Sequence, residues 1–402
     1  MFKGALPGFR DFYPRELAER AFIMNTWRDV ARRYAFVEYD GPPLEPLALY
    51  TTKSGDEIVG QLYNFVDKGG REVALRPEMT PTVARMVAAR ANALRKPVRW
   101  FSMPQLFRYE RQQKGRLREH YQLNVDIFGS PDVAADAELV ACAVDIMRAF
   151  SLTSGDVVVR VSDRRILQAF LESLGVPAGA ILGVYGVIDK LDRTPADVSA
   201  AKLAELAVPA DAIERIVTIA SVELAEVKSR VAGSPGAVHA DEFERYLSYV
   251  TALLGGDASW LTLDLSIVRG LAYYTGIVFE LFDRSGEFRA ICGGGRYDTL
   301  LQSLGGADMP ALGFGMGDVV LGELLRSKAL MRPASMLADY WIAADETTPM
   351  EQVMSETAKR RAAGHSVEYA LRPQSLSKQK KAAQASGAKE FITLSNDDAS
   401  NG

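Results

Sequence analysis

The chain has 402 residues, which is too long for one compact core and predicts two or three domains. Hydrophobic residues make up 48% and charged residues 24%, and the net charge of −4 means that any nucleic acid must be bound by local basic patches. Two cysteines and three histidines argue against a disulfide framework and against a transition-metal site built by the protein. No window approaches the length of a membrane span, and the N-terminus lacks the apolar core of a signal peptide, so we expect a cytoplasmic protein without membrane contact.

The first 150 residues alternate between helices and strands. An amphipathic helix is expected over 14–34. The strand after it, 36–50, is interrupted by Pro42 and Pro43, which suits an edge or an interface. The next predicted elements are a hairpin at 63–77, a helix at 81–94, strands at 97–107 and 123–129, and a helix at 136–150. This order predicts an α/β (α+β) fold with an antiparallel sheet and flanking helices.

The composition changes twice further along the chain. Residues from about 164 to 256 are rich in Ala, Leu, Val and Glu and predict a helical insert. Strands are then expected at 261–268, 276–283 and 287–295, followed by a glycine-rich strand and a helix within 308–328. After Pro333, strands and helices alternate as in a small parallel α/β domain. We therefore expect a first domain over 1–325, a linker over 326–336 and a second domain over 337–402, with a disordered tail at 396–402.

Cations crowd the stretch FRYERQQKGRLREHYQLNVDIFG, residues 107–129. Within eleven positions lie Arg108, Arg111, Lys114, Arg116 and Arg118. The apolar runs on both sides predict strands, so these side chains are expected on or beside a hairpin loop. Such a run is compatible with a solvated surface hairpin or with a site for a polyanion, and the choice depends on which other segments converge there.

Four further segments carry polar groups in apolar surroundings. They contribute Arg76, Glu78 and Thr80 in LRPEMT; Gln122, Asn124 and Asp126, which share one face if they lie on a strand; Arg269, Tyr273 and Tyr274, with Arg269 expected in an apolar strand; and Arg296 after three glycines. Because an unpaired buried arginine is costly, Arg269 and Arg296 each need an anion. A protein carboxylate is one alternative. The number of arginines favours a bound polyphosphate, whose oxygens match the guanidinium fork.

Common catalytic motifs are missing from the sequence. It contains no GxSxG elbow, no cysteine–histidine pairing, no P-loop and no GxGxxG that opens a helix after the first strand. The chemistry indicated is therefore substitution at a phosphate by positioning and charge neutralisation.

The motifs together resemble one known family over nearly the whole chain. FRYERQQKGRLREHYQ resembles motif 2 of the class II aminoacyl-tRNA synthetases, in the form of the histidyl-tRNA synthetases. IVRGLAYYTGIVFE and CGGGRYD resemble that family's two histidine signature segments, LRPEMT its amino-group-binding strand, and GPPLEP its motif 1. The pattern is similar to the plant-organelle-like bacterial branch. The resemblance implies a class II catalytic core with a helical insert, a C-terminal anticodon-binding domain, and a homodimer with Pro42 at its interface.

The resemblance also implies roles for matching residues. Arg108 would hold the α-phosphate of ATP, Glu110 would lie near the adenine, and Arg269 would neutralise the α-phosphate during attack, where other class II enzymes use a metal. The other implied contacts are Arg116, Arg296, Gly294 and Gly315 for ATP; Glu78, Met79, Thr80, Gln122, Asp126, Arg269, Tyr273 and Tyr274 for histidine; and Arg116, Arg118, Lys378 and Lys381 for tRNA. ATP would arrive with Mg²⁺, and no metal site built by the protein is implied.

Three features depart from the family's usual pattern. Ala272 stands where RGLDYY has an aspartate. Val320 stands where motif 3 usually has the arginine under the adenine, so we expect Phe314, Phe107 or an arginine from elsewhere in the chain to cover that ring. The second domain also ends soon after its last predicted strand, 388–394.

The implied activity is that of a histidine–tRNA ligase. Such an enzyme activates L-histidine with ATP to histidyl-adenylate and transfers the acyl group to the 3′ end of tRNA(His). The alternative is the family's non-catalytic relative, which regulates ATP phosphoribosyltransferase in histidine biosynthesis and lacks the anticodon-binding domain. The intact QQKGRLRE and the presence of residues 337–402 favour the ligase.

Overall fold

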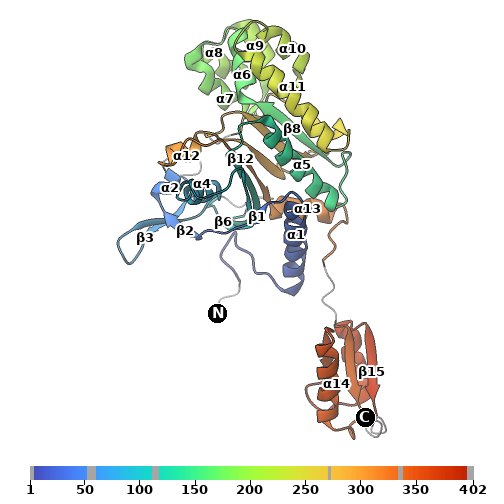
Figure 1. Ribbon diagram of the computed structural model, residues 1–402. Helices are drawn as coiled ribbons and strands as arrows, with labels where there is room; N and C mark the ends of the chain where they lie inside the picture. The colour runs from blue at the N-terminus through green and yellow to red at the C-terminus, as the bar shows by residue number, and fades with distance from the viewer. Residues whose placement is uncertain (1–3, 52–59, 111–116, 270–272, 334–337, 396–402) are drawn as a thin grey trace. The chain divides into compact units, whose positions relative to one another are not determined.

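The computed structural model describes residues 4–51, 60–110, 117–269, 273–333 and 338–395. The chain divides into two compact units, Met1–Arg332 and Pro333–Gly402, which are described separately (Figure 1). The tail that was expected to be disordered, 396–402, lies outside the described residues.

The first unit is built on a large, mainly antiparallel sheet. Its described strands are nine in number and follow the order β1-β5-β7-β12-β11-β10-β8-β9, with β6 also paired to β7. Their bounds are β1 (Val37–Glu38), β5 (Val98–Ser102), β6 (Gln105–Phe107), β7 (Glu119–Phe128), β8 (Val157–Asp163), β9 (Leu261–Leu263), β10 (Ile277–Asp283), β11 (Cys292–Arg296) and β12 (Ala311–Gly317). The pairs β1–β5 and β8–β9 are parallel and the other pairs antiparallel. The predicted fold class is confirmed.

One face of this sheet carries the main core. Alternate residues of β7, among them Leu123, Val125 and Ile127, point to this face and are buried. The helices that cover it are α1 (Pro14–Arg33), α5 (Val133–Ala149) and α13 (Asp318–Ser327) (Figure 1). Helix α1 contributes Trp27, which is fully buried. Each such side chain contributes on the order of 1.5–3 kcal/mol by leaving water, so this face holds the sheet in place.

The opposite face carries a smaller apolar cluster and leaves part of the sheet uncovered by large side chains. The elements on this side are α2 (Ala48–Thr51), α4 (Thr80–Ala88), α12 (Leu300–Ser303) and a small antiparallel sheet of β2 (Leu44–Pro46), β4 (Glu72–Leu75) and β3 (Tyr63–Val66). Four strand positions facing this side are glycines, namely Gly293, Gly295, Gly313 and Gly315. These four glycines form a surface without side chains of its own, the glycine floor, over which side chains of neighbouring residues lie.

The prolines of the expected 36–50 strand divide it in two. β1 pairs with β5 in the large sheet, whereas β2 pairs with β4 in the small one. Pro42 and Pro43 lie between them, where the missing N–H groups cost no ladder hydrogen bond. β1 forms one edge of the large sheet, and Val37 on it is 62% exposed.

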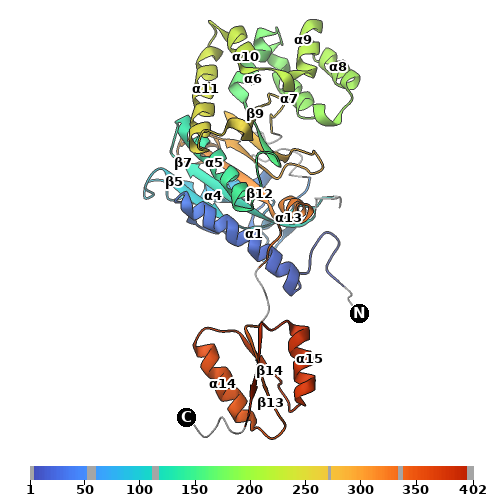
Figure 2. The same cartoon turned by 90° about the vertical axis from the view of Figure 1, so that its right-hand side faces the viewer.

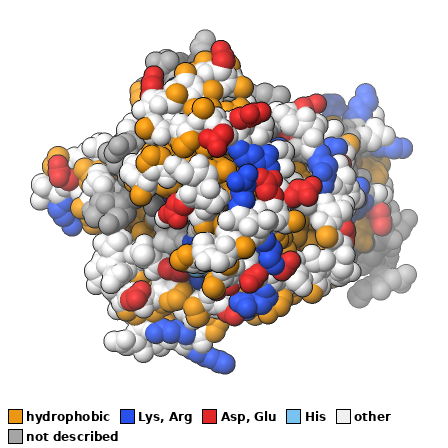
Figure 3. Space-filling model, turned by 90° about the horizontal axis from the view of Figure 1, so that it is seen from above, with side chains coloured by type: hydrophobic (Ala, Val, Ile, Leu, Met, Phe, Trp, Pro, Cys, Tyr) orange, Lys and Arg blue, Asp and Glu red, His pale blue; other side chains and the backbone are white. Residues whose placement is uncertain are grey.

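Between β8 and β9 the chain is mainly helical. The helices are α6 (Arg164–Ser173), η1 (Ala178–Ala180), α7 (Ile181–Ile188), η2 (Leu191–Arg193), α8 (Ala196–Glu205), α9 (Ala210–Val217), η3 (Ile219–Ser221), α10 (Leu224–Val231), α11 (Gly236–Leu253) and η4 (Ala258–Trp260). α11 packs along α5 and so joins the segment to the main core (Figure 1). Seen from above, Lys and Arg side chains are interspersed with Asp and Glu (Figure 3). That mixture matches the low net charge and gives this face no field of a single sign.

Two predicted strands are shorter than expected. The strand expected over 261–268 ends at Leu263, because Asp264 accepts hydrogen bonds from the backbone N–H of Ser266 at 2.9 Å and starts a turn. The strand expected over 287–295 begins only at Cys292. The carboxylate of Asp283 accepts the backbone N–H groups of Glu287 and Phe288, each at 3.0 Å, and holds that segment as a loop.

The second unit is a small three-layer α/β fold. Its described strands β13 (Tyr340–Ala344), β14 (Val367–Tyr369) and β15 (Glu390–Leu394) form a parallel sheet in the order β14-β13-β15. Helices α14 (Met350–Ala362) and α15 (Leu376–Ser386) cover its two faces (Figure 2). Ile342 packs on one side of β13 and Trp341 on the other, so this unit has an apolar core of its own.

Candidate active site

Polar side chains of β7 line the glycine floor. Gln122, Asn124 and Asp126 occupy alternate positions and share the face that also holds Gly313 and Gly315. A Cβ atom at Gly315 would lie 2.7 Å from Cδ of Gln122, and one at Gly313 would collide with the carboxylate of Asp126. These glycines are therefore required for the polar side chains to lie flat over the neighbouring strand.

Asp126 lies at the buried end of this row. The carboxylate is 3% exposed, and Oδ1 accepts a hydrogen bond from the hydroxyl of Tyr297. Oδ2 is buried and has no hydrogen-bond partner among the described residues. Burial raises the pKa of Asp126 to about 7, although the Tyr297 hydroxyl lowers it in part. Oδ2 is thus an acceptor in apolar surroundings that is available to a ligand.

A chain of aromatic side chains connects Asp126 to the LRPEMT segment. The rings of Tyr297 and Tyr273 meet edge to face at 5.7 Å, and the Tyr273 hydroxyl donates to Oε2 of Glu78 at 3.0 Å. Glu78 is buried immediately before α4, whose first residue is Thr80, and Met79 between them is fully buried. The ring of Tyr274 lies 5.0 Å from that of Tyr273. Residues far apart in the sequence therefore form one buried cluster of polar and aromatic side chains.

The side chain of Arg269 lies against β10 and β11. Arg269 is not in a strand, as the sequence predicted, but in the segment after the Asp264 turn, with a φ of 58°. Its guanidinium forms an ion pair with Glu280 on β10 and lies 5.9 Å from the Tyr274 ring centroid. A Cβ atom at Gly293 would lie 2.5 Å from Nη1 of Arg269, so this glycine makes room for the cation. A left-handed non-glycine residue costs on the order of 1–3 kcal/mol and is typical of functional sites.

The electrostatics keep Arg269 charged. Burial would lower its pKa, but the charge of Glu280 and the contact with Tyr274 raise it, and the net effect is a raised pKa. Nε of Arg269 is buried and has no hydrogen-bond partner among the described residues. The site thus holds a permanent cation with an unused N–H group.

The motif 2 segment forms the other end of the row. Nε of Arg108 donates to the carbonyl of Pro77 at 2.9 Å, and Arg108 pairs with the backbone of Arg118. The Arg118 guanidinium stacks over Tyr109 at 4.3 Å, and its Nε donates to the carbonyl of Glu110. Arg116, with the rest of 111–116, lies outside the described residues. Arg108 and Arg118, the arginines of the cationic run that the structure describes, therefore lie near both the LRPEMT segment and the start of β7.

Arg296 occupies a different position from the one that its predicted role requires. It lies on the face of β11 that points to the main core, with the side chain only about 6% exposed. Its guanidinium donates to Asp136, Asp298 and the carbonyls of Ser130 and Asp132, so every N–H group has an acceptor. The protein carboxylate alternative is the one that the structure shows, and the phosphate role is corrected accordingly.

Gly294 also lies on that core face. A Cβ atom there would meet the backbone of Gly313 and the side chain of Phe314, because the chain alternates and Gly293 and Gly295 face the site instead. The ATP contact expected of Gly294 stays a prediction, whereas Gly315 lies on the face that holds Asn124 and Asp126.

Of the residues expected to cover the adenine ring, Phe314 does not face the site. Phe314 packs against Phe279 in the main core, with ring centroids 6.2 Å apart, so it cannot cover a ligand on the opposite face. Val320 packs against the same core. An arginine from elsewhere does lie at this end of β7. Arg10 donates to Glu119 at 2.6 Å and to Asp318 at 2.8 Å, and with Arg108 it adds to burial in lowering the pKa of His120 to about 3.

Sequence reasoning missed four residues that the structure brings to the site: Tyr39, Ser102, Glu280 and Tyr297. Two of them had a signal in the sequence. Glu280 is the one ionisable side chain inside the apolar run GIVFELF, and Tyr297 directly follows Arg296 in CGGGRYD. Tyr39 and Ser102 join the site through the pairing of β1 with β5, which no local pattern indicates.

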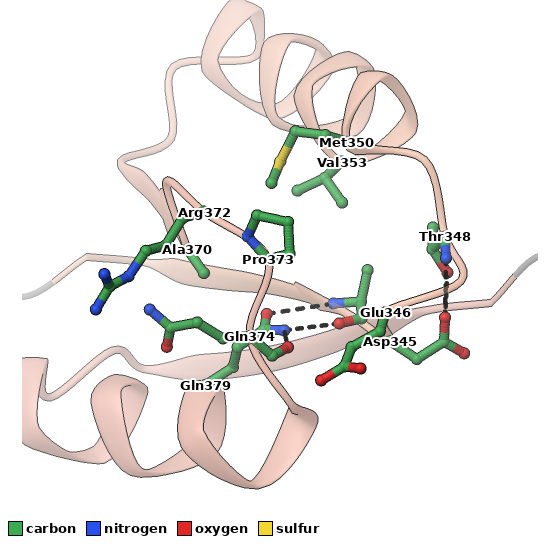
Figure 4. A pocket seen from close by; sticks show the side chains of 11 residues that line it. Asp345, Glu346, Thr348, Met350, Val353, Ala370, Arg372, Pro373, Gln374 and Gln379 are labelled. Carbon is green, nitrogen blue, oxygen red and sulfur yellow. Dashed lines mark hydrogen bonds between the residues drawn. The ribbon is translucent and has the colours of Figure 1, made fainter.

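The second unit has a crevice at the carboxyl ends of β13 and β14, the usual position for ligands of parallel sheets (Figure 4). Its volume is about 60 Å³. The Gln379 amide donates to the carbonyls of Ala344 and Gln374, both at 2.7 Å, and so holds the sheet end to α15. Lys378 and Lys381 are exposed on α15. The Gln379 side chain is therefore a structural link between the sheet and α15 at this crevice.

In the ranges that the structure describes, no group of three or more His, Cys, Asp or Glu side chains is placed to hold a metal ion. None of the described helices is both long and apolar enough to cross a membrane. Cys142 and Cys292 are buried and free.

The family model for histidyl-tRNA synthetase matches residues 8–317. The chain belongs to the histidyl-tRNA synthetase family. It is 45% identical over 392 residues to a histidine–tRNA ligase of Opitutus terrae, covering 96% of this chain and 89% of that one. It is 44% identical over 324 residues to the chloroplastic and mitochondrial histidine–tRNA ligase of Arabidopsis thaliana, covering 81% and 66%. The predicted membership, including its plant-organelle-like character, is confirmed.

The fold agrees with solved structures of this family. The crystal structure of histidyl-tRNA synthetase from Nostoc sp. PCC 7120 matches with a TM-score of 0.84 at 23% identity, covering 99% of this chain and 94% of the other. At that identity the match establishes a shared fold, and the assignment of residues depends on the geometry described above.

Proposed function

We infer that this chain is a histidine–tRNA ligase, an aminoacyl-tRNA synthetase that activates L-histidine with ATP and transfers it to tRNA(His). The observation that carries this conclusion is the similarity to histidine–tRNA ligases over nearly the whole chain. The regulatory alternative is less supported, because these relatives are ligases and the match extends through the second unit.

We propose that histidine occupies the pocket between Glu78 and Asp126. The buried carboxylate of Glu78, fixed by Tyr273, is suited to the substrate ammonium group. Thr80, the first residue of α4, and Gln122, on the polar face of β7, would supply polar contacts for the amino-acid backbone. Asp126 Oδ2, buried and unpartnered among the described residues, accepts an N–H of the imidazole.

ATP is proposed to lie along β7 and the glycine floor, with its α-phosphate between Arg108 and Arg269. The substrate carboxylate then attacks the α-phosphorus, and pyrophosphate leaves. Attack brings two anions together, so a fixed guanidinium in a partly dry site stabilises the transition state more strongly than water does. Glu280 fixes Arg269 before ATP arrives, and the unused Nε–H of Arg269 can donate to a phosphate oxygen. ATP brings Mg²⁺ as part of the substrate.

The remaining partners belong to the same proposal. tRNA(His) would place its 3′ end near the motif 2 loop, with Arg116 and Arg118, and its anticodon on residues 337–402, where Lys378 and Lys381 are exposed. A homodimer would form through the motif 1 segment around Pro42, beside the exposed edge strand β1. The enzyme would act in the cytoplasm.

The test is direct. The purified chain should catalyse histidine-dependent exchange of pyrophosphate into ATP and should charge tRNA(His). Absence of both activities from a folded preparation would contradict the assignment. Exchange without charging would limit the chain to the activation step.

A further inference from the structure

We propose that Tyr39 and Ser102 complete the part of the pocket that binds the substrate's imidazole, with their hydroxyl groups acting together with Oδ2 of Asp126. The proposal rests on the proposed function, because it assumes that histidine occupies this pocket. Neither residue lies in a segment whose residues the sequence assigned to a ligand.

The sheet register brings the three side chains to one face. β1 runs parallel to β5 with Val37 beside Trp100, and the backbone N–H of Tyr39 continues this ladder by donating to the carbonyl of Phe101 at 2.9 Å. Tyr39 therefore lies next to Ser102. On the other side of β5, Trp100 pairs with Asp126 and Ser102 with Asn124. Positions paired in this way share a face, which is the face of the glycine floor.

Each of the three side chains holds a polar atom that is buried and unused. The Tyr39 hydroxyl, the Ser102 hydroxyl and Asp126 Oδ2 have no hydrogen-bond partner among the described residues. Ser102 is fully buried. One buried polar atom without a partner costs on the order of 1–3 kcal/mol, so three on one patch indicate that something else completes them.

The Tyr39 ring is held in place independently of its hydroxyl. It packs on Trp100 with centroids 5.3 Å apart. Burial raises the pKa of Tyr39 well above its usual value, and the negative charge of Asp126 adds to this effect. Ser102 opposes the rise in part, so the two hydroxyls are neighbours, although they lack hydrogen-bond geometry. Tyr39 therefore remains a neutral O–H group that can donate.

A neutral imidazole can complete this patch, because it pairs with Asp126 Oδ2 and with one of the two hydroxyls, which are neighbours of each other. That ring has one N–H donor and one nitrogen acceptor. Asp126 Oδ2 can accept the N–H, and a hydroxyl can donate to the other nitrogen. A side chain without these groups would leave three buried polar atoms unpaired, and sites of this kind discriminate strongly against analogues that lack the polar group. Tyr39 is thus a specificity-determining residue.

The experiment compares histidine with the two pyrrolylalanines, whose rings keep one N–H and lack the second nitrogen. Pyrophosphate exchange gives kcat/KM for each amino acid with the parent chain, Tyr39→Phe and Ser102→Ala. Tyr39→Phe keeps the ring on Trp100 and removes the hydroxyl. We expect kcat/KM for histidine to fall about tenfold, as for loss of one hydrogen bond, while kcat/KM for the better pyrrolylalanine and KM for ATP stay at the parent values. The histidine preference then falls about tenfold, and Ser102→Ala should change it in the same direction.

Tyr246→Phe is the matched control, because the Tyr246 hydroxyl is also buried and unpartnered among the described residues but lies on α11 in the main core. It should leave the preference unchanged. An equal loss for histidine and pyrrolylalanine, or no loss in either variant, would overturn the proposal. If Tyr39→Phe does not fold, Ser102→Ala decides it. A parent chain without histidine-dependent exchange would refute the proposed function itself, which is a different outcome from exchange with unchanged selectivity.

Discussion

Glu280 on β10 holds the guanidinium of Arg269 above Gly293, while Nε of Arg269 stays buried without a hydrogen-bond partner among the described residues. The ion pair fixes the orientation of the cation before any substrate binds. The unused N–H and the missing Cβ of Gly293 leave one edge of the guanidinium facing the glycine floor. A guanidinium fixed in this way is suited to stabilising negative charge that develops on a substrate in the transition state.

Replacing Arg269 with lysine tests that arrangement. Lysine keeps the charge but loses the fork that can contact Glu280 and a phosphate together. We expect Arg269→Lys to fold and to bind ATP, and to form adenylate on the order of 10²-fold more slowly, as for loss of one preorganised donor. Rapid-quench measurement of adenylate formation decides this. Arg148→Lys, a control at a helix end remote from the pocket, should keep the parent rate; adenylate formation at the parent rate by Arg269→Lys would make Arg269 a structural ion-pair partner.

Arg296 should behave in the opposite way. All its N–H groups bond to the protein, so removing it leaves the buried carboxylate of Asp136 without its partner. We expect Arg296→Met to lower the free energy of unfolding by about 3–5 kcal/mol, as for other buried ion pairs that lose one member, and to leave KM for ATP unchanged in the folded fraction. Denaturant unfolding and exchange kinetics measure the two effects. A large rise in KM for ATP with unchanged stability would restore the phosphate role.

The ionisation of Asp126 links stability to function. Burial raises its pKa from 3.8 to about 7. Between these values the folded protein binds a proton that the unfolded chain has lost, so the stability from this group is present at low pH and is lost as pH rises towards 7. The slope is at most about 1.4 kcal/mol per pH unit. Asn at this position can still accept from Tyr297 and does not ionise.

We therefore expect Asp126→Asn to gain about 2–3 kcal/mol in the free energy of unfolding relative to the parent on going from about pH 5 to about pH 8. Its KM for histidine should rise most at about pH 8, where Asp126 of the parent is ionised and the variant lacks that carboxylate acceptor, and less at about pH 5, where Asp126 is protonated. Urea unfolding at the two pH values gives the comparison. A stability difference that does not vary with pH would mean that Asp126 titrates normally.

The second unit should be needed for tRNA and not for activation. It has its own core, and the pocket described above lies wholly within the first unit. We expect deletion of residues 333–402 to weaken tRNA(His) charging strongly and to leave histidine-dependent exchange within about twofold of the parent. Any contact of Lys378 and Lys381 with tRNA should weaken steeply with salt. Equal loss of charging and exchange would show that the unit supports the catalytic fold.

A homodimer is expected in solution. The exposed edge strand β1, with Val37 on its surface, adjoins the Pro42–Pro43 segment that resembles the class II dimer element. Light scattering at micromolar concentration should give twice the chain mass, and Val37→Lys should shift the mass towards that of the single chain, because a charge on an edge strand opposes pairing. A single-chain mass for the parent would refute the dimer.

The sequence alone determined the features that depend on local pattern. Alternation along β7 predicted that Gln122, Asn124 and Asp126 share a polar face, and the strand–helix alternation after Pro333 predicted a parallel α/β unit. These predictions succeed because side-chain direction in a strand has a period of two and because amphipathic helices show their own period. The family could also be recognised from the sequence, because its motifs are short local stretches.

Only the tertiary structure decided which polar groups meet. Arg269 and Arg296 look alike in the sequence, each in apolar surroundings, yet one faces the glycine floor and the other points into the core with Asp136. Tyr39 reaches the pocket because β1 pairs with β5 across about sixty residues of chain, a contact that no local propensity specifies. The side of the sheet on which a residue lies is set by register and by long-range pairing, and these follow from packing of the whole core rather than from the residues themselves.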